Sequence, residues 1–141
     1  MQLLYKLKTQ GDNYFHNYCN NKGYTLTLIR TTRGYRCGGF TTQNWSSRGS
    51  YVTDKNAFLF SLEFKEMYPI NNDGTNAIYD NGDRQAHFGN NDLYISTNCS
   101  QNYNSQCNFP YSYHGLKQRC LTGGVYNFKV DDMEVYLIKI E

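Results

Sequence analysis

Three strand-like segments follow one another between residues 24 and 62, and they commit the chain to a fold built on β-sheet. The first, residues 24–30, alternates threonine and isoleucine with leucine, which is typical of a pleated strand. A polar turn of hairpin length follows, and the chain returns through residues 35–42. The third segment, residues 57–62, is an almost continuous apolar run, as expected of a strand that is buried on both faces. We therefore predict that these segments form the core of the sheet.

Two adjacent glycines, Gly38 and Gly39, lie in the middle of the second segment. Glycine weakens a strand because it has no side chain to pack, and it marks places where a strand bulges or another backbone comes close. We expect one of these two features at this point.

The rest of the chain predicts further short strands and little helix. Strand patterns recur at residues 2–8, 63–70, 76–80, 84–88, 92–96, 125–130 and 132–140, and the last of these is expected to be central. One short helix is predicted over residues 13–20, with Asp12 as its N-cap and Phe15, Tyr18 and Cys19 on one face. Short strands separated by turn residues predict an antiparallel sandwich or barrel in a single domain, residues 1–141.

The composition narrows the class of protein. Aromatic residues make up 16% of the chain, and their rings pack well on a pleated surface. Fourteen basic and twelve acidic residues give a net charge of +2, which is too balanced for a nucleic-acid-binding surface. The N-terminus lacks the features of a signal peptide, and no window approaches the roughly 18 apolar residues of a spanning helix. We expect a soluble, intracellular and cytoplasmic protein without a nucleic-acid partner or a membrane span.

The thiols of the chain allow three interpretations. Cys19 and Cys37 fall on predicted elements and are expected to pack inside. Cys99, Cys107 and Cys120 lie in predicted loops, where exposed thiols are candidates for redox sensing. Together with His114 these three could also bind a metal, but the Cys-x2-Cys spacing of zinc sites is missing. Free thiols and no metal site are therefore the preferred interpretation.

The sequence contains no clear pattern for catalysis. No familiar signature surrounds any cysteine, so a nucleophile paired with histidine is not indicated. The acids at Asp80 and Asp83, and at Asp131, Asp132 and Glu134, would form a glycosidase pair only if they faced one cleft. The glycine pairs Gly38-Gly39 and Gly123-Gly124 lack the lysine and hydroxyl residue that end a P-loop. We expect neither an enzymatic activity nor a cofactor.

An ordered series of short motifs resembles the TLDc domain, which is found in oxidation-resistance proteins. The motifs are LLYK (3–6), FH (15–16), CNNKG (19–23), TLTLI (25–29), GGFTTQNWSS (38–47), KNAFLFSL (55–62), AIYD (77–80), HFGNNDLYIS (87–96) and NFKVDDMEVYLI (127–138). The resemblance implies a mainly β fold, a two-sheet antiparallel β-sandwich with one or two short helices. It also implies a non-catalytic role in protection against oxidative stress and binding to the vacuolar proton-pumping ATPase (V-ATPase).

Seven residues in two loops are candidates for contact with a protein partner. Trp45 either folds into the core or anchors a partner, because tryptophan is often buried and is also enriched at interface hot spots. The second loop has asparagines where sequences of the family often have a glycine run, and asparagine tolerates the left-handed conformation of such a turn. The family's usual N-terminal helix is also missing, which would expose a sheet edge unless a neighbour covers it. The seven candidates are Trp45, Arg48, Tyr51, Gly89, Asn90, Asn91 and Asp92.

The leading functional hypothesis is a protein-interaction module of TLDc type that is bound to a large assembly on a membrane complex or the cytoskeleton. One alternative is a structural subunit of a large, for example cytoskeletal, assembly. Another is a carbohydrate-binding or enzymatic β-sandwich that uses the loops around Trp45 and residues 97–111.

Overall fold

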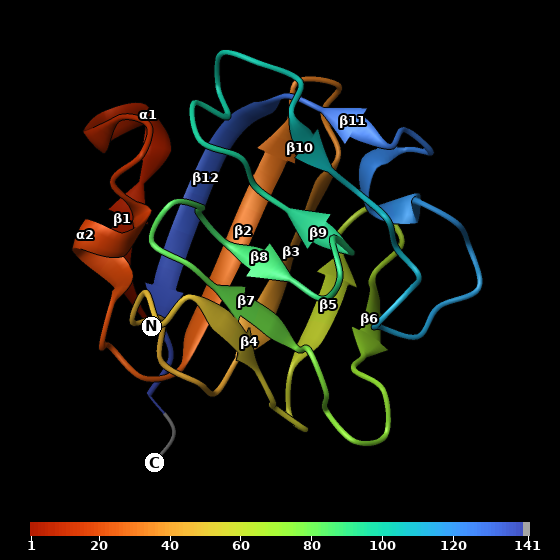
Figure 1. Cartoon of the computed structure of the whole chain (residues 1–141). Coiled ribbons are helices and arrows are strands. Elements are labelled where there is room, and N and C mark those ends of the chain that lie inside the picture. The colour runs from red at the N-terminus through yellow and green to blue at the C-terminus, as the bar shows by residue number, and fades with distance from the viewer. Residues whose placement is uncertain (140–141) are drawn as a thin grey trace.

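The three predicted strands lie side by side in the larger of two antiparallel sheets of the computed structural model, which describes residues 1–139. In spatial order this sheet contains β1 (Gln2–Lys6), β12 (Val130–Leu137), β2 (Thr25–Thr31), β3 (Arg36–Thr41), β5 (Phe58–Ser61) and β6 (Glu66–Pro69). The second sheet contains β11 (Asn127–Phe128), β10 (Ser105–Gln106), β9 (Leu93–Tyr94), β8 (His87–Phe88), β7 (Ile78–Asp80) and β4 (Ser50–Val52). Figure 1 shows the second sheet in front of the larger one, and this confirms the two-sheet sandwich.

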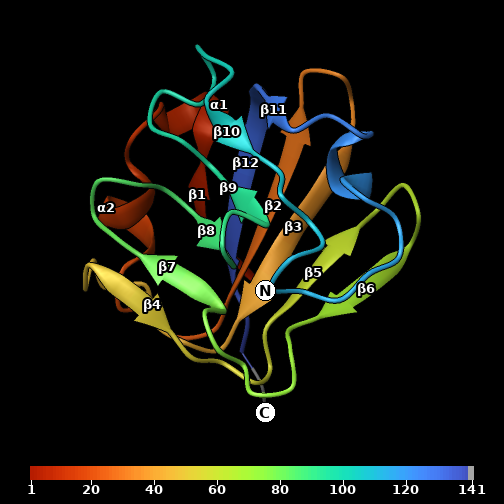
Figure 2. The same ribbon diagram turned by 45° about the vertical axis from the view of Figure 1, so that its right-hand side comes forward.

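The helices are shorter than predicted. The helix expected over residues 13–20 is α2 (Phe15–Cys19), and Asp12 does not cap it. The Asp12 carboxylate instead accepts hydrogen bonds from the backbone and hydroxyl of Ser100, because the loop containing Ser100 folds back onto this region. The end of the predicted first strand forms a further single turn, α1 (Leu7–Gln10), and the short 3-10 helix η1 is Cys120–Thr122. Both α-helices lie beside β1 at one edge of the larger sheet (Figure 2).

The predicted last strand is central, because β12 pairs with β1 on one side and with β2 on the other. It begins two residues earlier than expected, at Val130, and ends at Leu137. The final residue of the prediction, Ile140, lies outside the described residues.

The two glycines of β3 leave room for different neighbours, Gly38 for the adjacent strand and Gly39 for a ring from the second sheet. The register of β3 with β2 and β5 is continuous through Gly38 and Gly39, so the strand does not bulge there. A Cβ atom on Gly38 would collide with the backbone carbonyl of Thr27, and one on Gly39 would lie 2.6 Å from carbons of the Phe88 ring. The close approach of another backbone is confirmed at Gly38, whereas Gly39 leaves room for the Phe88 ring from the opposite sheet.

Small polar residues face the core on β2, and leucines face outward. Thr25 and Thr27 are buried between the sheets, whereas Leu26 and Leu28 are only partly covered on the outer face. The large rings of Trp45, from the loop after β3, and of Phe88, from the second sheet, lie in the same layer and leave room only for small side chains there.

Three buried aspartates hold the long loops on the sandwich. The Asp54 carboxylate binds the hydroxyls of Thr41 and Thr42, and the Asp80 carboxylate binds the loop that follows β3. Asp92 accepts backbone N–H groups from Tyr111 and its two successors at 2.8–3.0 Å. Loop backbone has no neighbouring strand to pair with, so these carboxylates supply the hydrogen-bond acceptors that a strand would otherwise provide.

Candidate interaction site

Apolar side chains cover the middle of the outer face of the larger sheet. The register places Leu26, Phe40 and Phe58 in one row across β2, β3 and β5. The next row contains Leu28, Gly38, Phe60 and Met67, and the Phe60 ring lies over the glycine. We call this set the apolar strip: Leu26, Leu28, Phe40, Phe58, Phe60 and Met67.

The apolar strip is a shallow hollow of about 390 Å³ that five of its six members line, all except Phe40. Phe58 had been expected to be buried on both faces of its strand, but it is only partly buried. The two α-helices lie at the β1 edge, and η1 is buried against β3 and β5, so no helix of the described chain forms a second layer over this face (Figure 2). Met67 is 64% exposed.

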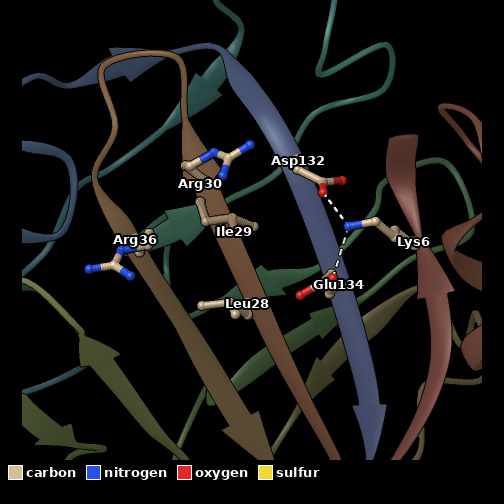
Figure 3. A pocket seen from close by; sticks show the side chains of 7 residues that line it. All are labelled: Lys6, Leu28, Ile29, Arg30, Arg36, Asp132 and Glu134. Atoms are coloured by element: carbon tan, nitrogen blue, oxygen red, sulfur yellow. Dashed lines mark hydrogen bonds and ion pairs between the residues drawn. The ribbon is translucent and has the colours of Figure 1, made fainter. Parts of the chain in front are cut away.

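Ion pairs border the apolar strip at Leu28, where a second hollow of about 210 Å³ begins. Figure 3 shows Lys6 reaching from β1 between two acids of β12. Its Nζ atom lies 2.6 Å from Asp132 Oδ2 and 2.9 Å from Glu134 Oε2. Arg36 points away from the lysine and pairs with Glu63.

The charges of this border favour an ion-pair network over acid–base chemistry. The hydrogen bond from Lys6 holds the pKa of the Glu134 carboxyl below its usual range, and the two carboxylates raise the pKa of Lys6. Arg30 similarly lowers the pKa of Asp131 by a hydrogen bond. A general acid needs a raised pKa, so these acids are better suited to ion pairing.

Three of the predicted contact residues meet on the outer face of the second sheet. Tyr51 on β4 is exposed, and its hydroxyl donates to the side-chain oxygen of Asn90 at 3.3 Å. Asn91, in the same turn, is partly exposed and adopts the positive φ of 64° that was anticipated for this turn. Arg48 is exposed as well, but its guanidinium pairs with the buried Asp80 at 3.3 Å.

The other three predicted contact residues are buried. Trp45 is fully buried, and its indole N–H donates to Thr25 Oγ1 at 3.1 Å, so of its two predicted placements the one in the core is correct and the one as a surface anchor is wrong. Gly89 is buried against Asp92. Asp92 is itself fully buried, and burial raises the pKa of its carboxyl, although the backbone donors that it binds act in the opposite direction.

The three loop thiols are buried, which contradicts their prediction as exposed redox sensors. Cys99 and Cys107 are fully buried and Cys120 nearly so, because the long loop returns to the second sheet through β10 and β11. Burial raises the pKa of Cys107 to about 11 and that of the other two thiols as well. Within residues 1–139, no group of three or more Cys, His, Asp or Glu is arranged to hold a metal ion.

All five thiols are expected to resist modification in the folded protein. A thiol reacts as its thiolate, and burial with a raised pKa leaves little thiolate near neutral pH. Titration with a chromogenic disulfide reagent should therefore give less than one reacted thiol per chain in buffer and five after denaturation. Fast reaction of two or more thiols in buffer would contradict this arrangement.

The apolar strip was missed by the sequence analysis. Its signal was present, since leucines and phenylalanines occupy one face of residues 26–28 and 58–60. The pattern could not say which face looks outward, because the opposite face of β2 carries threonines that are equally compatible with a strand.

Comparisons with known proteins agree with the motif series. A family model described as "TLDc domain" matches residues 1–139. A curated protein from Danio rerio, "MTOR-associated protein MEAK7", is 32% identical over 63 residues, which are 43% of this chain and 14% of that protein. The chain therefore spans only a small part of the length of the relative that it matches. None of the helices in the described part of the chain is both long and apolar enough to cross a membrane.

Proposed function

Because the chain belongs to the TLDc domain family, we propose that it is a non-catalytic protein-interaction module that docks on a large assembly. The observation that carries the proposal is the apolar strip on the outer face of the larger sheet. Soluble proteins seldom leave a contiguous apolar surface open unless it serves binding.

The surroundings of the apolar strip match the anatomy of a protein interface. Such interfaces have an apolar centre enriched in aromatic residues and methionine, with a polar rim. Here the centre contributes three phenylalanines and Met67, and the ion pairs of Lys6 and Arg36 form the rim on one side. Since these charges are already paired, they add specificity more than affinity.

The family and the relative suggest which assembly to test first. Subunits of the V-ATPase, with a role in oxidative-stress protection, are the first candidates from the resemblance to TLDc proteins. The name of the zebrafish relative adds an mTOR-containing complex. We propose that the chain acts in the cytoplasm, at the surface of such an assembly.

A structural subunit of a cytoskeletal assembly would use the same surface, so the identity of the partner distinguishes it from the regulatory role. A carbohydrate-binding or enzymatic role loses support, because Trp45 was the aromatic platform of that alternative and is buried.

The proposal is tested by affinity purification of the tagged chain from cell extract in mild salt, followed by quantitative mass spectrometry. Met67→Glu is the informative variant, because Met67 is largely exposed and the fold should tolerate the change. We expect the yield of the main partner to fall by about tenfold or more, as for a hot-spot residue.

The matched control is Tyr103→Glu, which changes an equally exposed apolar residue to the same acid in the loop after β9. It should recover the partner at the wild-type level. Recovery of V-ATPase or mTOR-complex subunits would identify a regulatory role, and a fixed-ratio set of cytoskeletal proteins would identify a building block. An unaltered yield with Met67→Glu, or no partner in stable ratio with the wild type, would overturn the proposal.

A further inference from the structure

A ladder of aromatic rings crosses the outer face of the second sheet, on the opposite side of the sandwich from the apolar strip. One outward-facing residue of each of four adjacent strands contributes a ring, and in Figure 1 these strands lie side by side. The ring centroids are 4.8 Å apart from Tyr51 to Tyr79, 5.3 Å from Tyr79 to His87 and 4.8 Å from His87 to Tyr94. We call these four residues the ring ladder.

A single arginine lies across the ring ladder. The Arg84 guanidinium carbon is 5.3 Å from the centre of the Tyr79 ring and 5.1 Å from that of Tyr94. These are the tyrosines on either side of His87, so Arg84 spans the position of the histidine. The backbone of Arg84 is anchored too, because its carbonyl accepts a hydrogen bond from His16 at 2.7 Å.

The charge of Arg84 has no partner within residues 1–139. Arg30, Arg36 and Arg48 each pair with a carboxylate, whereas none lies within 4.0 Å of the Arg84 guanidinium. A guanidinium that stacks on aromatic faces keeps its in-plane N–H groups free, and their fork matches the two oxygens of a carboxylate.

A buried polar group at the same place also lacks a partner. His87 is 1% exposed, and neither of its ring nitrogens has a hydrogen-bond partner among the described residues. Burial and the charge of Arg84 lower the pKa of His87 to about 4, although the Asn91 side chain acts in the opposite direction, so the imidazole is neutral near pH 7 and Arg84 alone supplies positive charge. Buried polar groups are nearly always paired, so an unpaired one beside an open, oriented cation indicates a site for a ligand.

The geometry points to a binding site for an acidic protein segment on this face, with Arg84 receiving a carboxylate between Tyr79 and Tyr94. Tyrosine and arginine are the residues that most often carry interface energy, and here they are already held in place. One guanidinium fits a carboxylate, whereas recognition of phosphate groups relies on clusters of basic residues. The segment would bind independently of the partner on the apolar strip.

The test is a fluorescence-anisotropy titration of the whole chain with fluorescein-labelled hexaglutamate at low salt. Arg84→Gln is expected to weaken binding by about tenfold, and Arg84→Lys should restore little because an ammonium group lacks the planar fork. Amide shifts of β7, β8 and β9 in NMR spectra should accompany binding by the wild type.

Two controls keep the outcome unambiguous. Arg33→Gln removes the same charge from an exposed arginine in the β2–β3 turn and should leave the affinity within about twofold of wild type. Met67→Glu should also bind hexaglutamate normally, so failure here is distinguishable from failure of the proposed function. Equal weakening by Arg84→Gln and Arg33→Gln, or the absence of saturable binding, would overturn the inference.

Discussion

Replacement of Asp80 by alanine is expected to lower the free energy of unfolding by about 3–5 kcal/mol. The Asp80 carboxylate is fully buried and accepts backbone N–H groups from Ser46, Ser47 and Arg48 at 2.9–3.2 Å. It also accepts the Ser46 hydroxyl and pairs with the Arg48 guanidinium. Alanine would leave all of these donors without their acceptor in a place that water reaches poorly, which is why the expected loss exceeds that of one hydrogen bond.

Urea unfolding followed by circular dichroism measures this effect. Asp83→Ala is the matched control, because Asp83 is exposed in the turn that follows β7 and no ion pair of the described chain involves it. We expect it to change stability by less than about 0.5 kcal/mol. Asp80→Asn should lie between the two, since its one side-chain oxygen retains part of the acceptor capacity. Equal stability of the two alanine variants would show that Asp80 does not hold the loop.

Replacement of Trp45 by alanine is the second large effect, with an expected loss of about 3–5 kcal/mol in the free energy of unfolding. Trp45 packs edge-on against Phe15 from α2 and Phe88 from β8, at centroid distances of 5.1 and 5.7 Å. Its removal would open a cavity where both sheets and α2 meet. It would also remove the indole donor from Thr25.

Calorimetry suits this variant, because Trp45 is the only tryptophan and its fluorescence is lost with it. Trp45→Phe should lose clearly less stability than Trp45→Ala, since a smaller cavity remains. Tyr103→Ala removes an aromatic ring that is 61% exposed and is expected to be nearly neutral. A Trp45→Ala variant as stable as wild type would contradict the placement of this side chain in the core.

The local pattern of the chain was sufficient for several features of the fold. The alternation in residues 24–30 and 132–138 predicted strands, and both form long strands at the centre of the larger sheet. The same holds for Gly38, where the sequence anticipated close approach of another backbone, whereas the close neighbour of Gly39 is the Phe88 ring. These features depend on neighbours along the chain or across one hairpin, which short-range patterns report well.

The candidate site was only partly predictable. Tyr51, Asn90 and Asn91 were expected at a binding surface, and the structure makes Tyr51 a member of the ring ladder, with its hydroxyl bonded to Asn90. Arg84 and His87 were not singled out, because a free arginine or a buried histidine has no signature in a single sequence. Only the pairing of β7, β8 and β9 brings their rings and charge together.

The sequence by itself determined the strands of the larger sheet, the antiparallel class and the positions where side chains had to be absent, since these follow from backbone sterics and local pattern, whereas β4 and β10 lie in segments expected to be loops. Tertiary structure decided which face of each strand looks inward. Thr27 faces the core and Leu28 faces outward because Phe88 from the other sheet enters above Gly39 and takes up the space. It likewise decided that Cys99, Cys107 and Trp45 are buried, because the loops that contain them close over the sandwich. Burial is a property of packing between distant segments, and no single segment of the chain contains that information.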